Sequence, residues 1–330
     1  MRAPEFWERD DRFSRILTAI LTPIGWLYGA SVAWRARNGR RFRAHAKVIC
    51  VGNLTAGGSG KTPIAIAVAQ ALAAQGLKVM FLSRGYGGRA RGPMLVDADM
   101  HDAADVGDEP LLLAAAAQVI VARDRHEGAE FADSFAPDVI VMDDGHQNFA
   151  LEKDLSLVVI DAATGFGNGR MLPAGPLREP VAQGLKRADA VILVGDGTPR
   201  LGAWAGPMLR AHLEPRASET LKGRRVVAFA GIAQPAKFLA SLAASGAEIV
   251  ESVPFGDHHT YSAAQIARLK AKARANDAGL VTTEKDFVRL TKNEREGIDV
   301  LPIAARFDDP AALAALLDRL GPNAIAPAPA

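Results

Sequence analysis

The sequence has 330 residues, of which 49% are hydrophobic and 23% are charged, and its formal net charge is +2. A chain of this size can bury substantial cores, and its length favours two domains over one. The single cysteine, Cys50, excludes an internal disulfide and any cysteine-based metal cage, which suits a reducing compartment such as the cytosol.

The charges are unevenly distributed along the chain. No Asp or Glu occurs from Arg12 to Val96, whereas thirteen Lys and Arg residues fall in that span. Such an excess of positive charge predicts an anionic partner. Phosphate groups, anionic lipid headgroups and nucleic acid all satisfy this prediction, and composition alone does not choose among them.

Residues 1–46 are predicted to form an amphipathic, membrane-associating segment. No charged residue occurs between Ile16 and Trp34, but Pro23, Gly25 and Gly29 disfavour a helix that spans the bilayer. We expect a helix lying in the membrane interface, and the alternative is a helix packed on the protein's own core. Its apolar residues recur at helical spacing, and arginines follow them: Phe13, Ile16, Leu17, Ile20, Leu21, Ile24, Leu27 and Tyr28, then Arg35, Arg37, Arg40, Arg41 and Arg43.

Short apolar runs alternate with helical stretches over residues 47–218. A helix is expected at 62–74, and strands are expected at 48–51, 78–82, 119–122, 139–142, 157–160 and 191–194. This alternation predicts an α/β fold, in which a parallel sheet like that of the P-loop NTPases is sandwiched by helices.

A second alternating series predicts a smaller α/β domain over residues 219–321. Strands are expected at 226–230, 248–253 and 280–283, and helices at 235–245, 263–275 and 310–320. The remaining segment, 322–330, is rich in Ala and Pro and is expected to be a disordered tail.

A glycine-rich turn lies between the first strand and the first helix of the core. Its glycines allow backbone amides to converge on phosphate oxygens, Lys61 can neutralise the β- and γ-phosphates, and Thr62 can hold Mg²⁺. The general P-loop pattern has Gly where Thr55 stands, which is the one mismatch. The predicted nucleotide-binding residues of the turn are Thr55, Ala56, Gly57, Gly58, Ser59, Gly60, Lys61 and Thr62.

Asp143 and Asp144 directly follow the apolar run at 139–142. The carboxyl ends of parallel strands form the ligand-binding edge of an α/β sheet. The two carboxylates therefore resemble a Walker B element that orients Mg²⁺ or its water. Paired aspartates after a strand are also common as simple turn formers.

The motifs of this chain, in their order, resemble the lipid A 4'-kinases (tetraacyldisaccharide 4'-kinases) of Gram-negative bacteria. They are Val51-Gly52-Asn53-Leu54, the glycine-rich turn with Pro63, Ser83-Arg84-Gly85-Tyr86-Gly87, Gly107-Asp108-Glu109-Pro110, Asp143-Asp144-Gly145, the segment from Leu172 to Pro180, Asp257-His258 and Thr283-Glu284-Lys285-Asp286. The segment His146-Gln147-Asn148 departs from the family pattern, so no catalytic role is assigned to it.

The resemblance implies an ATP- and Mg²⁺-dependent kinase. Its acceptor would be the 4'-hydroxyl of an acylated disaccharide 1-phosphate lipid, and its place would be the cytoplasmic face of the bacterial inner membrane, bound peripherally or monotopically to an anionic surface. No nucleic acid and no required protein partner are expected.

The resemblance also implies roles for individual residues. Asp108 would be the catalytic base, His258 its partner and Lys61 a third catalytic residue. Arg178 would counter phosphate charge, and Glu179 would lie near the metal with Thr62, Asp143 and Asp144. Without the family, the structural interpretation is favoured for both residues, Asp108 as a helix N-cap and His258 as a loop histidine with its hydrogen bonds satisfied. Arg84 and Arg125 are weaker candidates for phosphate or substrate contacts.

Four alternatives remain from the residues alone. A membrane-partitioning ATPase would have Lys where Ala56 stands, and a GTPase would have the guanine-reading Asn-Lys-x-Asp pattern, which Thr283-Glu284-Lys285-Asp286 matches only loosely. A nucleic-acid-binding P-loop protein or a kinase for a different small molecule could use the same core.

Overall fold

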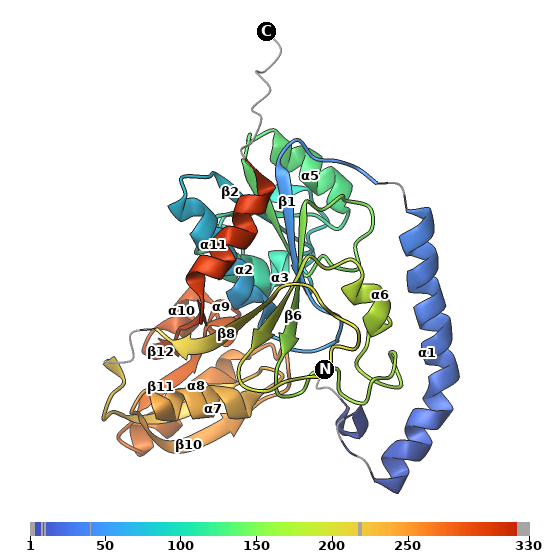
Figure 1. Ribbon diagram of the computed structural model, residues 1–330. Coiled ribbons are helices and arrows are strands. Elements are labelled where there is room, and N and C mark those ends of the chain that lie inside the picture. Colours follow the sequence, from blue (N-terminus) through green and yellow to red (C-terminus); the bar gives the residue numbers. More distant parts are fainter. Residues whose placement is uncertain (1–3, 8, 10, 40, 217–219, 322–330) are drawn as a thin grey trace.

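The structure is a computed structural model that describes residues 4–7, 9, 11–39, 41–216 and 220–321 (Figure 1). It contains a nine-stranded sheet, a four-stranded sheet and an N-terminal helix that lies along one side of the body. The expected disordered tail, 322–330, falls outside the described residues.

The large sheet has the strand order β13-β8-β7-β6-β1-β5-β2-β4-β3. Only its two edge strands, β3 and β13, pair antiparallel with their neighbours. The prediction of a P-loop NTPase-like parallel sheet is therefore confirmed. The strands are β1 (Lys47–Gly52), β2 (Val79–Ser83), β3 (Met94–Leu95), β4 (Gln118–Val121), β5 (Val139–Asp143), β6 (Leu155–Asp161), β7 (Ala190–Val194), β8 (Met208–Pro215) and β13 (Ile303–Phe307).

Helices cover both faces of this sheet because alternate strand residues point to opposite sides. Ile49 and Phe81 pack with the buried face of α2, whereas Val48 and Met80 pack toward α5. The helices of this part are α2 (Lys61–Ala74), α3 (Ala103–Val106), α4 (Asp108–Ala114), α5 (Arg125–Asp133), α6 (Val181–Leu185) and α11 (Pro310–Leu317).

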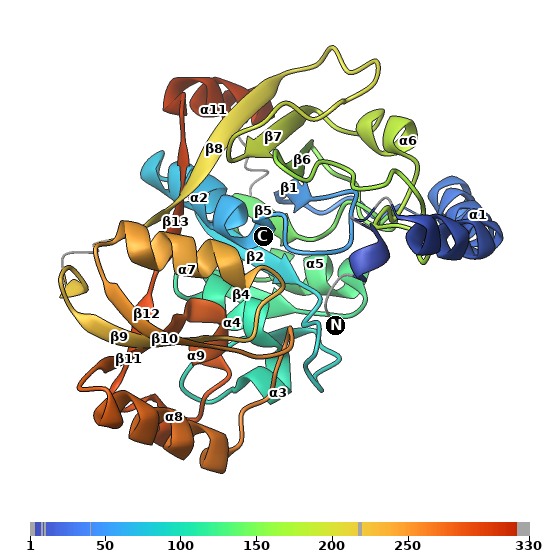
Figure 2. The same cartoon turned by 90° about the horizontal axis from the view of Figure 1, so that it is seen from below.

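Residues 220–301 form a second group of strands and helices, which we call the small unit. Residues 41–216 together with 303–321 are called the large unit. The small unit contains a parallel sheet of order β10-β9-β11-β12. Figure 2 shows this sheet near α3 and α4. Its elements are β9 (Arg225–Ala230), α7 (Pro235–Ala244), β10 (Glu248–Pro254), α8 (Ala263–Ala275), β11 (Gly279–Thr283), α9 (Glu284–Val288), α10 (Lys292–Arg295) and β12 (Ile298–Leu301).

The structure differs from the expected smaller domain of residues 219–321 at its C-terminal end. Strand β13 leaves the small unit and pairs with β8 of the large sheet, and Leu313, Leu316 and Leu317 of α11 pack in the large core. Strand β8 was not predicted, although its apolar residues alternate with Arg210, His212 and Glu214, which is the period of a strand with one buried face. The chain therefore crosses between the units twice.

The N-terminal helix α1 (Arg12–Asn38) follows the short 3₁₀ helix η1 (Glu5–Trp7) and turns its small residues toward the protein. Ser14, Gly25 and Val32 are buried. A Cβ atom on Gly25 would lie only 3.1 Å from the carbonyl oxygen of Met171, so a larger residue there would have to push this loop away by a few tenths of an ångström.

The apolar side chains of α1 face away from the body. Phe13, Ile20 and Leu27 are 72%, 65% and 73% exposed, and Ile16, Ile24, Trp26 and Trp34 are exposed as well. We call these seven residues the outward face. The helix is long and apolar enough to cross a membrane by length and composition, yet little of it is buried in the protein. The alternative of an apolar face packed on the protein's own core is therefore wrong.

Candidate active site

The glycine-rich turn joins β1 to the N-terminus of α2, as the sequence predicts. Gly57 and Gly60 have φ angles of 121° and 82°, a backbone region that residues with a Cβ rarely adopt. Gly60 is the N-cap of α2, so the helix begins at Lys61. The turn therefore directs the first amides of a buried helix toward one point, which is the arrangement that binds phosphate.

The mismatch at Thr55 has a structural explanation. Thr55 forms an isolated bridge with Leu177, and the amide of Ala56 donates to the carbonyl of Pro176 at 2.7 Å. Neither residue has a positive φ, so glycine is not required there. The far end of the turn is fixed by the Asn53 Nδ2 atom, which donates to the hydroxyl of Ser59 at 3.0 Å.

Strand β5 lies directly beside β1, and this pairing places Asp143 and Asp144 next to the turn. Lys61 Nζ lies 3.8 Å from Asp144 Oδ1, and Arg178 donates to both oxygens of Asp144 at 2.9 and 3.0 Å. Burial raises the pKa of Asp144, but the charges of Lys61 and Arg178 outweigh it and lower the pKa below its ordinary value. These residues, with the buried Thr62, form a compact cluster of charges.

Asp143 is the least satisfied carboxylate of the cluster. It is buried, and its Oδ1 atom has no hydrogen-bond partner among the residues that the structure describes. Burial, together with the negative charges of Glu109 and Asp144, raises its pKa well above the ordinary value of a carboxyl. A buried oxygen without a donor fits a divalent cation or a water bound to it, since either would remove this penalty.

Glu179 lies behind this cluster. Its carboxylate accepts hydrogen bonds from Gln147 at 2.9 Å and from Arg187 at 2.6 Å, and only 1% of its side chain is exposed. Gln147 also donates to the carbonyl of Asn53 at 2.8 Å. Glu179 thus connects the 172–180 loop to the turn, whereas its predicted contact with the metal stays a prediction.

Asp108 and His258 meet across the boundary between the two units. Asp108 is the first residue of α4, and His258 lies in the loop after β10, where its amide donates to the carbonyl of Gly231 at 3.1 Å. The Nδ1 atom of His258 is 3.2 Å from Asp108 Oδ2. The ring of Tyr86 lies edge-on to the His258 ring at 5.9 Å. The structure therefore brings together the two residues that the sequence analysis paired.

Arg289, which no sequence motif indicates, also contacts Asp108. Its Nε atom donates to Asp108 Oδ2 at 3.0 Å, and Nη2 pairs with the same oxygen. Lys285 forms a second contact between the units, with Glu109 at 3.0 Å. The Thr283-Glu284-Lys285-Asp286 motif gave a signal for this region, but a single arginine three residues later carries none of its own.

Burial raises the pKa of Asp108, yet His258, Lys285 and Arg289 together hold it well below its ordinary value. The carboxylate is 5% exposed. Asp108 is therefore ionised at neutral pH. The backbone amide of Glu109 donates a hydrogen bond to the Oδ1 atom of Asp108 at 3.0 Å.

Two arginines lie on the same edge of the sheet. Arg84 follows β2 and is exposed, and it has no hydrogen-bond or ion-pair partner among the described residues. Arg125 begins α5 and is 4% exposed; it donates to the carbonyl of Ala122 at 2.6 Å, while its Nε atom has no partner. Burial, with the like charge of Arg84, lowers the pKa of Arg125 to about 10. Both side chains have donors that can bind an anion.

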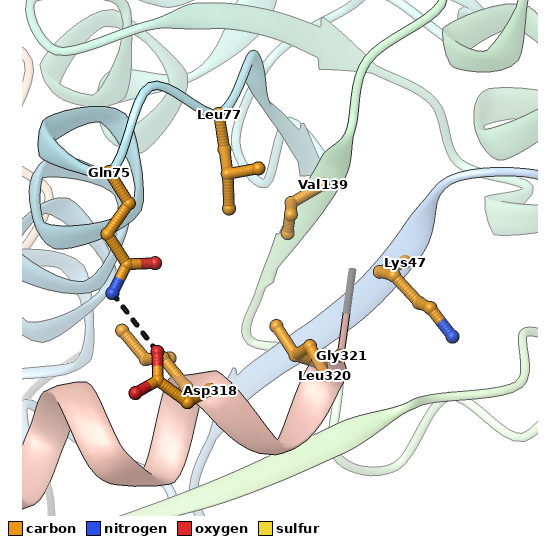
Figure 3. Close-up of a pocket in the computed structure, with 8 residues that line it drawn as sticks. Lys47, Gln75, Leu77, Val139, Asp318, Leu320 and Gly321 are labelled. Atoms are coloured by element: carbon orange, nitrogen blue, oxygen red, sulfur yellow. Dashed lines mark hydrogen bonds between the residues drawn. The ribbon is translucent and has the colours of Figure 1, made fainter. Parts of the chain in front are cut away.

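A cavity of about 320 Å³ lies at the opposite edge of the sheet, as Figure 3 shows. It is lined by Lys47 and Val139, the first residues of β1 and β5, and by Asp318 and Leu320 near the end of the described chain. Because the turn and the aspartates lie at the carboxyl ends of these strands, this cavity takes no part in the site described above.

Three comparisons with known proteins agree on one family. The family model described as tetraacyldisaccharide-1-P 4'-kinase matches residues 17–321. Tetraacyldisaccharide 4'-kinases of Paramagnetospirillum magneticum and Maricaulis maris are 49% and 46% identical to this chain, over 98% and 96% of it and 100% and 96% of their own lengths. A crystal structure of LpxK from Aquifex aeolicus in complex with ATP superposes with a TM-score of 0.77 at 28% identity, covering 92% of this chain and 99% of that one.

Proposed function

This chain belongs to the tetraacyldisaccharide-1-P 4'-kinase family, and from that premise we propose how its residues carry out phosphoryl transfer. It is an ATP-dependent kinase of lipid A biosynthesis that phosphorylates the 4'-hydroxyl of tetraacyldisaccharide 1-phosphate, and it uses Mg²⁺. The assignment of the reaction to particular side chains is the proposed part.

The turn from Thr55 to Thr62 binds the triphosphate of ATP. Its amides and Lys61 neutralise the phosphates, and Arg178, which now pairs with Asp144, adds a second positive charge. The unpartnered oxygen of Asp143 supports a site for Mg²⁺ formed by Thr62, Asp143 and Asp144, with Glu179 beside it. When bound there, Mg²⁺ neutralises charge on the β- and γ-phosphates.

Asp108 is the base that receives the proton of the acceptor hydroxyl. The acceptor oxygen forms a bond to the γ-phosphorus as the bond from that phosphorus to the bridging oxygen of ADP breaks, and the proton passes to Asp108. The observation that carries this proposal is the 3.2 Å contact between Asp108 Oδ2 and His258 Nδ1, which joins a carboxylate of the large unit to an imidazole of the small unit. Through this contact, His258 orients the carboxylate and stabilises its negative charge.

Arg84 and Arg125 are proposed to face the phosphate groups of the bound substrates. The support is physical: two like charges lie near each other, and the buried Nε atom of Arg125 lacks an acceptor. An anion between them would remove both penalties.

The outward face of α1 is proposed to lie in the membrane interface at the cytoplasmic side of the inner membrane. Seven exposed apolar side chains on one face of a helix, followed by Arg35 and Arg41, combine a hydrophobic and an electrostatic signal for a surface of anionic lipids. The acceptor is itself a lipid, so this attachment would bring the enzyme to its substrate.

The test of the base is an assay of phosphoryl transfer from labelled ATP to tetraacyldisaccharide 1-phosphate in detergent. We expect Asp108→Ala to lower kcat by about 10²- to 10⁴-fold, because a positioned base contributes that much, and His258→Ala to lower it in the same direction. The Kd for ATP should change little in either variant.

Asp99→Ala and His45→Ala are the matched controls, since both side chains are more than nine-tenths exposed and lie outside the site. They should retain the turnover of the unmodified enzyme. Turnover close to that level in both Asp108→Ala and His258→Ala would disprove the proposed pair.

A further inference from the structure

Arg289 connects two buried carboxylates that belong to different units. On one side its Nε and Nη2 atoms contact Asp108 Oδ2 of the large unit. On the other side its Nη1 atom donates to Asp286 Oδ1 at 2.9 Å and to the carbonyl of Gly231 at 2.8 Å. Every nitrogen of the guanidinium group therefore has an acceptor, and one planar group fixes the position of both units at this point.

Asp286 holds the guanidinium group rigidly because its own contacts are complete. It is fully buried, and it accepts hydrogen bonds from Tyr261 at 2.8 Å, from the hydroxyl of Thr283 at 2.7 Å and from the amide of Gly231 at 3.0 Å. The direction of Arg289 is thus set within the small unit, by residues that the catalytic proposal does not use.

Four charged or titratable side chains surround the carboxylate of Asp108. His258 and Arg289 contact its Oδ2 atom directly, Lys285 adds a positive charge, and Glu109 is the adjacent acid that Lys285 pairs with. Arg289 is the one of these cations that contacts Asp108 through two nitrogens, and its side chain is only 7% exposed. Water therefore screens this pair much less than a surface pair.

We propose that Arg289 is a positioning residue for phosphoryl transfer, which holds the Asp108 carboxylate ionised and correctly oriented only when the small unit is docked against the large one. The proposal rests on the proposed role of Asp108 as the base. Phosphoryl transfer passes through a loose transition state in which little charge builds up on the acceptor oxygen early. A carboxylate that stays ionised can therefore orient the hydroxyl first and take its proton late.

The experiment compares Arg289→Gln and Arg289→Lys in the detergent assay from pH 3.5 to pH 9. In Arg289→Gln we expect kcat to fall about 10-fold or more. An adjacent opposite charge lowers the pKa of a carboxyl by about 1–3 units, so its removal should move the acid limb of the pH profile up toward the ordinary carboxyl value of about 4. The activity of this variant should then decrease below about pH 4.5, where the unmodified enzyme, whose Asp108 pKa is lower, stays active.

Arg289→Lys separates charge from geometry. Lysine keeps the positive charge, so the acid limb should stay in place, but it cannot contact both carboxylates as a planar fork, so kcat should remain below that of the unmodified enzyme. Arg295→Gln is the control for general damage, because Arg295 belongs to the same small unit and donates to backbone carbonyls of residues 287, 288 and 290. It should leave the acid limb unchanged.

An acid limb that does not move in Arg289→Gln, or full turnover in Arg289→Lys, would overturn the proposal. If Arg289→Gln does not fold, the turnover of Arg289→Lys decides alone. Asp108→Asn in the same assay distinguishes the two hypotheses. Near-normal turnover of Asp108→Asn would disprove that Asp108 is the base. A large loss in Asp108→Asn with no effect of the Arg289 substitutions would disprove only the positioning role of Arg289.

Discussion

The two halves of the proposed active site are built in different ways. The phosphate half consists of residues 55–62 with Asp143 and Asp144, and its parts follow two adjacent strands, β1 and β5, of one sheet. The base half joins Asp108 of the large unit to His258 and Arg289 of the small unit, and Asp108 and Arg289 are 181 residues apart.

This difference shows which half depends on the relative position of the units. The phosphate half needs only a local turn and a helix N-terminus, both fixed within the sheet. The base half exists only while α4 contacts α9, since its ion pairs cross between the units. Changes in the first half should therefore affect ATP directly, whereas changes in the second should affect turnover and leave ATP binding largely intact.

The largest effect is expected from Lys61→Ala in the phosphate half. Removing the cation that neutralises the transferred phosphoryl group should lower kcat/KM on the order of 10³-fold or more and should also weaken ATP binding. Lys78→Ala, an exposed lysine at the opposite edge of the sheet, is the control for the same change. Activity of Lys61→Ala within a few-fold of the unmodified enzyme would break the assignment of this half.

The next largest effect concerns the coupling within the base half. Asp108→Ala and His258→Ala should each reduce kcat, and the double variant should lose about as much as the worse single variant, because the two side chains act as a unit. The measurement is a double-mutant cycle on kcat with the ATP Kd of every variant. Independent, multiplying losses would show that the two residues do not act together.

A smaller effect is expected on membrane binding, which should change without affecting either half of the active site. Ile20→Asp with Leu27→Asp places two charges on the outward face of α1, and binding to vesicles with anionic lipids should weaken about 10-fold or more. ATP binding should be unchanged. Met100→Asp with Met208→Asp makes the same change at exposed apolar residues elsewhere, and equal loss of vesicle binding in that control would contradict a role specific to α1.

The smallest effect concerns the pH dependence of the unfolding free energy, through a histidine buried next to the phosphate half. His146 is buried, with Nδ1 3.1 Å from the hydroxyl of Ser156 and Nε2 3.0 Å from the carbonyl of Gly184. Burial, with the charges of Lys153 and Arg187, lowers its pKa to about 3. The unfolded chain therefore binds a proton near pH 6.5 that the folded chain does not, so this histidine costs stability as the pH falls below that value.

The expected loss from His146 is about 1–2 kcal/mol of unfolding free energy between pH 7 and pH 5. In His146→Gln this part of the pH dependence should disappear, although the variant can be less stable overall. Urea unfolding at several pH values measures it, with the exposed His45→Gln as control. The same pH slope in His146→Gln and the unmodified protein would show that another group is responsible.

The sequence by itself determined the parts whose residues are neighbours in the chain. The alternating apolar runs predicted the parallel sheet, and the turn at 55–62 predicted a phosphate site, because a strand, a glycine turn and a helix N-terminus are fixed by local backbone conformation. The pair Asp143 and Asp144 was placed at the correct edge for the same reason, since all parallel strands end on one side. The motifs also carried the resemblance to the family that the comparisons confirm.

The tertiary structure decided what depends on contacts between distant segments. It returned β13 and α11 to the large sheet, because an antiparallel partner for β8 and an apolar surface beside α2 were available there. It placed Gly25 and Gly29 of α1 against Met171, where a residue without a side chain allows close approach, and it left the outward face exposed. It also brought Arg289 to Asp108, a contact that no spacing encodes, because the energy of a buried ion pair depends on where two units meet and not on either segment alone.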